Sequence, residues 1–198
     1  MEAARPAEDW KGVVIGSTSE VSFRGKSLPE VAQSLGVDPV EAALRLIEGD
    51  ELKTSAFFFG MSEDNMWKIL AEPFVMLGSD ASLRALEGPL SQDFPHPRAY
   101  GAFPKFLRAA LDGKTVMLPE AIRKMTSLPA DHFQIKERGR VVEGSYADLV
   151  VFDPNTVADV ATFGQPHALA KGIECVMVNG VPTLDQTGLT GQRAGRIL

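Results

Sequence analysis

What this sequence lacks excludes several classes of protein. It has one cysteine, Cys175, among 198 residues, so it has no internal disulfide framework, and a reducing cytoplasm is its expected location. No window approaches the roughly 18 consecutive apolar residues of a membrane-spanning helix. The formal net charge of −6 leaves no excess of basic residues for a nucleic acid or an anionic membrane. We therefore expect a cytoplasmic protein that binds neither nucleic acid nor membrane.

Histidine is also scarce, and its spacing argues against a metal site built by this chain alone. The three histidines are His96, His132 and His167, and no two of them form an H-x-H or H-x-x-x-H pair. Cys175 lies within an apolar strand pattern and is most simply a small core residue. The sequence also lacks a G-x-S-x-G motif, a phosphate-binding glycine loop and a dinucleotide-binding fingerprint. It therefore contains no complete active site of its own.

Two helices in succession are the first feature that is present. The segment SLPEVAQSLG (27–36) has a capping-box pattern at its start and a glycine at its end. The segment from Asp38 to Gly49 begins with an aspartate cap followed by proline, and Val40, Leu44 and Ile47 form one apolar stripe along it. Two tandem helices this short are expected to pack as a hairpin.

The next segments predict a βαβ unit. SAFFFG (55–60) and FVMLG (74–78) are apolar runs without alternation, and a helix pattern that starts at Ser62 separates them. Such strands are typical of a parallel sheet covered on both faces. Asp80 then lies just past the carboxyl end of the second strand.

A long loop and two further helices complete the first part of the chain. Residues 81–101 are rich in proline and glycine, and a loop this long is expected to be functional or disordered. Apolar spacing predicts helices over 104–112 and 119–128.

After Arg138 the sequence becomes rich in β-forming segments. RGRVV, ADLVVFD and CVMVNGVPTL are β-rich, and Asn179-Gly180 predicts a hairpin with a type I′ turn. Pro182 places the second strand of that hairpin at a sheet edge. We predict an α/β chain with a domain boundary near residue 135: a helix-and-strand part over 1–134 and a small β part over 135–198.

Three side chains are candidates for chemistry. Asp80 is well placed, because ligands gather at the carboxyl ends of parallel strands; a turn aspartate bonded to nearby amides is an equally good interpretation. Arg98, in His96-Pro97-Arg98, can bind a substrate carboxylate through two parallel hydrogen bonds, although alone it reads more simply as a solvated arginine. His96 could be a ligand or a proton donor, but a plain loop histidine is the simpler interpretation.

These residues also carry a family resemblance. The order GSDAS, GPLSQDFPHPRAYGAFPKFL, LPEAIRKMTSLPADHF, RGRVVEGSYADLVVFDPNTVADVATF and GIECVMVNG resembles the C-terminal part of N-acyl-D-amino-acid deacylases (D-aminoacylases) of the metal-dependent amidohydrolase superfamily. The ADLVVFDP element is found throughout that superfamily. The combination of GSD, the HPR motif with its following YGAFP, and TVADVATF is more specific.

The resemblance implies a fold and a site. The fold is the C-terminal portion of a (β/α)8 barrel followed by strands of a small β-sandwich domain. Asp80 corresponds to the aspartate after the last barrel strand, which in the family acts as general base on a zinc-activated water and then gives the proton to the departing amine. Arg98 matches the arginine that binds the α-carboxylate of the N-acyl-D-amino acid, with His96 beside it.

The family's zinc ligands have no counterpart in this sequence, because they belong to an upstream half. We therefore expect a C-terminal half whose isolated form binds zinc weakly and is inactive, with a missing N-terminal half or self-association as its partner. Two alternatives stay open: another amidohydrolase of the hydantoinase or dihydroorotase kind, and a non-catalytic fragment.

Overall fold

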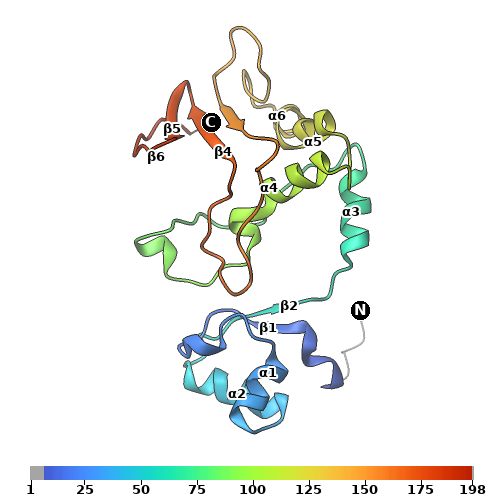
Figure 1. Cartoon of the computed structure of the whole chain (residues 1–198), viewed down its shortest axis with the longest axis vertical. Helices are drawn as coiled ribbons and strands as arrows, with labels where there is room; N and C mark the ends of the chain where they lie inside the picture. Colours follow the sequence, from blue (N-terminus) through green and yellow to red (C-terminus); the bar gives the residue numbers. More distant parts are fainter. Residues whose placement is uncertain (1–6, 198) are drawn as a thin grey trace. The chain divides into compact units, whose positions relative to one another are not determined.

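The computed structural model describes residues 7–197 and divides the chain into two compact units (Figure 1). The first unit contains the described residues up to Ser62, with Ala81–Ala99 and Ala161–Ala168. The second contains Glu63–Asp80, Tyr100–Val160 and the described residues from Leu169 onward. The predicted boundary near residue 135 falls inside the second unit. The division into a partial barrel over 1–134 and a small β domain over 135–198 stays a prediction.

The first unit is built on a helical hairpin. Its elements are η1 (Ala7–Gly12), β1 (Val13–Ile15), η2 (Val21–Phe23), α1 (Leu28–Leu35), α2 (Pro39–Gly49), β2 (Ala56–Phe58) and η3 (Pro89–Ser91). Both predicted helices are confirmed. The Glu30 carboxylate accepts the backbone N–H of Ser27 over 2.7 Å, and Asp38 accepts the N–H groups of Val40 and Glu41 over 2.9 and 3.1 Å.

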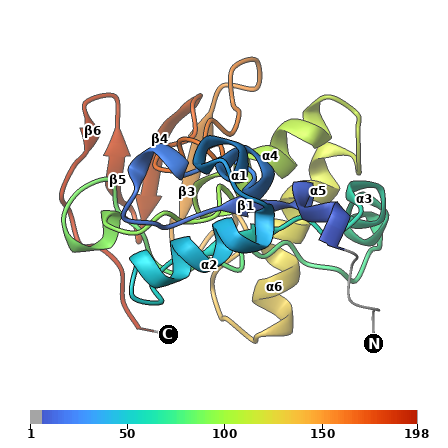
Figure 2. The same cartoon turned by 90° about the horizontal axis from the view of Figure 1, so that it is seen from below.

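The core of the first unit lies between α1, α2 and β1, which Figure 2 shows side by side from below. Its buried members are Ile15, Leu28, Val31, Ala32, Ala42 and Leu46. The predicted stripe on α2 is wrong as a buried face, because Val40, Leu44 and Ile47 are 46%, 57% and 40% exposed. Ala42 and Leu46, one turn apart, form the buried side of α2 instead.

The second unit combines four helices and a small sheet in its described residues. They are α3 (Glu63–Ala71), α4 (Arg98–Leu111, the second unit starting at Tyr100), α5 (Leu118–Met125), α6 (Ser127–His132), β3 (Leu149–Phe152), β4 (Ile173–Val178), β5 (Val181–Asp185) and β6 (Gly188–Leu189). The predicted helix over 104–112 starts six residues earlier, so Pro104 lies inside α4. The predicted helix over 119–128 is divided into α5 and α6 at Thr126, whose φ and ψ of −131° and −84° are not helical. None of the described helices is long and apolar enough to cross a membrane.

The sheet of the second unit is antiparallel with the order β3-β4-β5-β6. The Asn179-Gly180 hairpin is confirmed, with φ values of 51° and 80° as a type I′ turn requires. Pro182 pairs with Met177 on the β4 side, whereas β6 pairs only with Leu184 and Asp185. The predicted edge position of β5 is wrong, because β5 lies between β4 and β6. Its proline is tolerated because it falls outside the part of β5 that pairs with β6.

The predicted βαβ unit is wrong. Strand β2 exists, and α3 follows it, but β2 pairs with β1 in antiparallel register. Residues 74–78 form no strand, and the predicted β segment over 138–142 forms none either. All strand pairs among residues 7–197 are antiparallel. An apolar run becomes a strand only when a neighbouring strand accepts its backbone hydrogen bonds, and residues 74–78 find other partners, described below.

Candidate functional site

Asp80 ends a stretch of irregular backbone in the second unit. Its side chain is exposed and its φ is 47°, in the left-handed region that a non-glycine residue rarely adopts. Gly78 does not have a positive φ, and a Cβ there would meet nothing within 4 Å. The left-handed backbone conformation therefore belongs to Asp80 itself and not to the glycine two residues before it. Such outliers cluster at functional sites, and aspartate is also one of the residues that tolerates them best.

The backbone before Asp80 is firmly held. Leu77 packs against the buried cluster of Phe106, Ala110 and Ala121, and its N–H donates to the carbonyl of Lys124 over 3.3 Å. The carboxylate thus follows, by three residues, a half-buried leucine that is held by packing and by a backbone hydrogen bond, and a candidate catalytic group on an irregular segment needs such support.

His96 and Arg98 lie together at the start of α4, within the first unit. The N–H of Arg98 donates to Nδ1 of His96 over 3.0 Å, and the N–H of Ala99 donates to the His96 carbonyl over 3.0 Å. The Arg98 residue is exposed, whereas His96 is half-buried. The motif therefore works first as a helix start that satisfies amides of the first turn.

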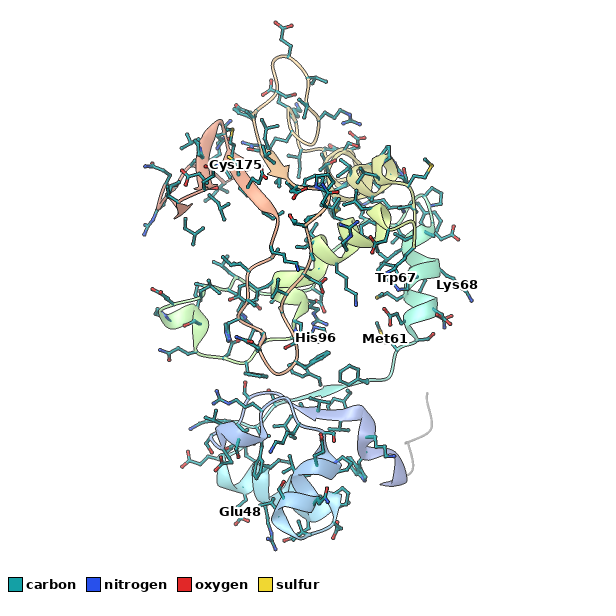
Figure 3. The ribbon with its side chains drawn as sticks, in the orientation of Figure 1. Glu48, Met61, Trp67, Lys68, His96 and Cys175 are labelled. Atoms are coloured by element: carbon teal, nitrogen blue, oxygen red, sulfur yellow. The ribbon has the colours of Figure 1, made fainter. Side chains whose placement is uncertain are left out.

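The imidazole of His96 is packed among aromatic rings, in the region labelled in Figure 3. Its centroid lies 5.4 Å from that of Phe57 and 4.9 Å from that of Phe163, with interplanar angles of 88° and 83°. Phe163 also meets Phe59 edge-on at 4.7 Å. Edge-to-face packing fixes the plane of the imidazole, so His96 holds the backbone of Arg98 from a rigid support.

The loop that leads to His96 is ordered by specific contacts. Arg84 pairs with Asp93 over 2.7 Å, and the N–H of Phe94 donates to the Ser17 hydroxyl over 3.2 Å. The sequence predicted that the loop over 81–101 is functional or disordered; these contacts argue against disorder, residues 98–101 belong to α4, and the functional alternative stays a prediction.

The predicted site residues are therefore distributed over both units. His96 and Arg98 belong to the first and Asp80 to the second. Two cavities of about 520 and 580 Å³ lie elsewhere in the second unit, against β4 and β5 and around Tyr146. Neither contains Asp80, His96 or Arg98.

Two charged residues, Asp50 and Lys124, are buried, which the sequence did not predict. Asp50 is 7% exposed, and its carboxylate accepts the Ser19 N–H over 2.9 Å and hydrogen bonds from the Ser19 and Thr54 hydroxyls. The hydroxyl of Ser19, followed by that of Thr54, holds the pKa of Asp50 well below its usual range. Lys124 is completely buried on α5. Both occur in sequence contexts that are typical of solvated charges.

The residues that the structure describes do not fit a metal ion. Over residues 7–197, no group of three or more histidine, cysteine, aspartate or glutamate side chains is placed to hold one. His132 packs edge-on against Phe133 at 4.9 Å, and Cys175 is half-buried within β4. We assign no chemical step in this chain to a metal.

Comparison with known proteins gives one consistent family. The profile of the amidohydrolase family matches residues 1–184. The D-aminoacylase of Alcaligenes xylosoxydans xylosoxydans is 41% identical over 175 residues, which is 88% of this chain and 34% of that protein. The N-acyl-D-glutamate deacylase of the same organism is 38% identical over 183 residues, 92% of this chain and 35% of that protein. The chain thus spans about a third of the length of these relatives.

Solved structures agree with the sequence matches. The N-acyl-D-glutamate deacylase of Bordetella bronchiseptica, solved with zinc and a phosphonate mimic of the tetrahedral intermediate, superposes with a TM-score of 0.79 at 35% identity. That match covers 97% of this chain and 38% of the other. A D-aminoacylase crystal structure gives a TM-score of 0.75 at 39% identity and covers 93% of this chain and 37% of the other.

Proposed function

Because the chain belongs to the amidohydrolase family, we propose that it contributes to the hydrolysis of N-acyl-D-amino acids. The observation that carries this proposal is that its curated relatives, at 35–41% identity, are a D-aminoacylase, an N-acyl-D-glutamate deacylase and an N-acyl-D-aspartate deacylase. They differ in the D-amino acid and share the reaction, so the reaction is what the resemblance supports best.

In this reaction water adds to the acyl carbonyl and the C–N bond breaks, giving a carboxylate and a free D-amino acid. We assign Asp80 the role of general base, which takes a proton from the attacking water and returns it to the departing amine. Its exposed carboxyl and its position after an anchored segment support this role. We assign Arg98 to the α-carboxylate of the substrate, because a guanidinium binds a carboxylate with two parallel hydrogen bonds. His96 supports the backbone of Arg98.

The fold, the location, the metal and the partner of the chain are also proposed from its similarity to the deacylases. We place the chain as the C-terminal portion of a (β/α)8 barrel, followed by strands of a β-sandwich domain, in a cytoplasmic enzyme. Zinc, present in the solved deacylase, would be held by residues outside this chain and would activate the attacking water. The partner of the chain would be that remaining portion or, in its absence, a second copy.

The test starts from the coding sequence directly upstream of the Met1 codon. If that sequence encodes an H-x-H pair, a cysteine and later histidines, the encoded segment is co-expressed with this chain. If there is none, the unmatched portion of the Alcaligenes D-aminoacylase is used. We call this preparation the completed enzyme. Release of a D-amino acid from N-acetyl-D-amino acids supports the proposal.

The control is D80N, which is expected to lower kcat by about a thousandfold if the carboxylate is the base. A completed enzyme that hydrolyses hydantoins but no N-acyl-D-amino acid would transfer the assignment to the cyclic-amide hydrolases. A completed preparation without hydrolase activity would favour a non-catalytic fragment.

A further inference from the structure

The ammonium group of Lys124 is the most unusual charge in the described part of the chain. Its side chain, in the last turn of α5, has 0% exposure. A lysine is almost never fully buried unless its donors are satisfied. Nζ donates to the carbonyl of Val75 over 3.0 Å and to that of Glu72, and the Glu120 carboxylate lies 3.9 Å away.

Both carbonyls that accept hydrogen bonds from this ammonium belong to the backbone that leads to Asp80. The same turn of α5 makes two further bonds to that segment: the N–H of Leu77 donates to the Lys124 carbonyl over 3.3 Å, and Nη2 of Arg123 donates to the Pro73 carbonyl over 2.5 Å. Residues 73–77 have no strand partner among residues 7–197. The end of α5 therefore provides the hydrogen bonds that a neighbouring strand would otherwise provide.

Asp80 follows Leu77 by three residues, a span of at most about 10 Å. Leu77 is fixed both by its bond to Lys124 and by packing on the cluster around Phe106. The position of the carboxylate then depends on how firmly residues 72–77 are held. The buried Nζ cannot reach a substrate itself, so its influence on chemistry has to pass through this backbone.

We infer that Lys124 is a positioning residue, whose ammonium clamps the carbonyls of Glu72 and Val75 and thereby holds Asp80 in its working place. The inference rests on the proposed role of Asp80 as general base. The arrangement couples one buried side chain to the segment that presents the carboxylate, as precise catalytic geometry requires.

The first experiment uses the chain as it exists and does not depend on activity. Amide hydrogen exchange over residues 72–80 is compared in wild type, K124M and K124R, with K68M as control, since Lys68 on α3 points away from the rest of its unit (Figure 3). K124M removes the donors while keeping a long side chain, so exchange at Leu77 and the residues after it is expected to rise about tenfold. Arginine keeps donors at this position, so K124R is expected to remain within about threefold of wild type.

Exchange over 72–80 that is unchanged in K124M would overturn the inference. If K124M unfolds the whole second unit, seen as a change in the fluorescence of the half-buried Trp67, K124R decides instead. In K124R, protection of both α5 and residues 72–80 at the wild-type level supports the clamp, whereas loss of protection in α5 while residues 72–80 stay protected contradicts it.

The second experiment uses the completed enzyme. K124M is expected to lower kcat about a hundredfold with KM changed less than about twofold, because Asp80 acts on the chemistry rather than on binding. A smaller fraction of folded enzyme lowers the rate equally at every pH, whereas a displaced general base also moves the acidic limb of the pH–rate profile. K124R should restore both kcat and that limb. An acidic limb identical to wild type would exclude positioning. If wild type shows no deacylation, the proposed function fails, whereas the exchange data still decide whether Lys124 clamps residues 72–80.

Discussion

The backbone N–H of Arg98 donates to Nδ1 of His96 over 3.0 Å, so the two functional candidates of the HPR motif are bonded directly to each other. A ring nitrogen can accept only while it is unprotonated. The flanking Phe57 and Phe163 rings keep the imidazole in that orientation. His96 is therefore best understood as the residue that presents Arg98, because its Nδ1 accepts the Arg98 N–H and its ring packs between Phe57 and Phe163.

Replacing His96 by phenylalanine keeps an aromatic ring and removes the acceptor. Loss of a bond that satisfies a first-turn amide is worth about 1 kcal/mol, so exchange of the Arg98 and Ala99 amides should be about fivefold faster in H96F. The measurement is residue-resolved hydrogen exchange on the chain. H96N is the control, because an asparagine accepts from the amide two residues ahead. Equal exchange in H96F and wild type would show that the Nδ1 contact does not stabilise the turn.

Arg98 tests the binding half of the proposed site. In the completed enzyme, R98A is expected to raise KM for N-acetyl-D-amino acids about a hundredfold, because a bidentate charge-assisted pair with the α-carboxylate is lost. R98K should recover part of this, since lysine keeps the charge without the planar fork. The matched control is R45A, which removes an exposed arginine of α2 that pairs with Glu41. A KM for R98A equal to that of R45A would remove Arg98 from the site.

Asp50 predicts a pH-dependent stability of the first unit. Its pKa is lowered from 3.8, mainly by the Ser19 hydroxyl and then by that of Thr54. A lowered pKa contributes stability that is fully present above 3.8 and is lost as the pH falls through the folded-state pKa. D50N should therefore unfold with a free energy about 2 kcal/mol lower at pH 7, and the difference from wild type should shrink below about pH 4.

The measurement of that difference is urea unfolding in a W67F background, where Trp10, which packs on the first core, is the remaining tryptophan. E51Q changes a neighbouring carboxylate that is 82% exposed and should cost almost nothing. If the difference in unfolding free energy between D50N and wild type stays constant down to pH 3, the ionised Asp50 carboxylate is not the source of the stability.

Gly172 is required for steric reasons in the second unit. Its φ is +72°, and a Cβ there would lie 2.4 Å from the backbone nitrogen of Val157, which is fully buried. G172A should lower the free energy of unfolding by about 3 kcal/mol through backbone strain and the clash together. G144A is the matched control, since Gly144 has a φ of +85° with nothing within 4 Å of a Cβ. Trp67 fluorescence in a W10F background reports the unfolding, and equal costs for the two variants would show that the clash relaxes.

Local features were predicted well where a few neighbouring residues decide the outcome. The capping pattern at Ser27 and the Asp38 cap predicted the starts of α1 and α2 correctly, and Asn179-Gly180 predicted the hairpin between β4 and β5. Each of these depends on backbone geometry within about four residues. The motifs around Asp80 and Arg98 likewise identified a family that the comparisons confirm.

Predictions that needed distant partners were less successful. The apolar stripe of Val40, Leu44 and Ile47 is exposed because α2 packs through Ala42 and Leu46. Apolar spacing identifies an amphipathic helix, but the neighbouring elements decide which side is covered.

The sequence by itself determined the family, the helix starts and the type I′ hairpin, and it is the source of the proposal that Asp80 and Arg98 are site residues. These follow from residue identity and from spacing over short distances along the chain. Only the tertiary structure decided that FVMLG is held by the end of α5 rather than by a strand, and that the Lys124 ammonium is buried against the carbonyls of Glu72 and Val75. The partner of a backbone carbonyl can be some fifty residues away, and only packing brings a buried cation to it.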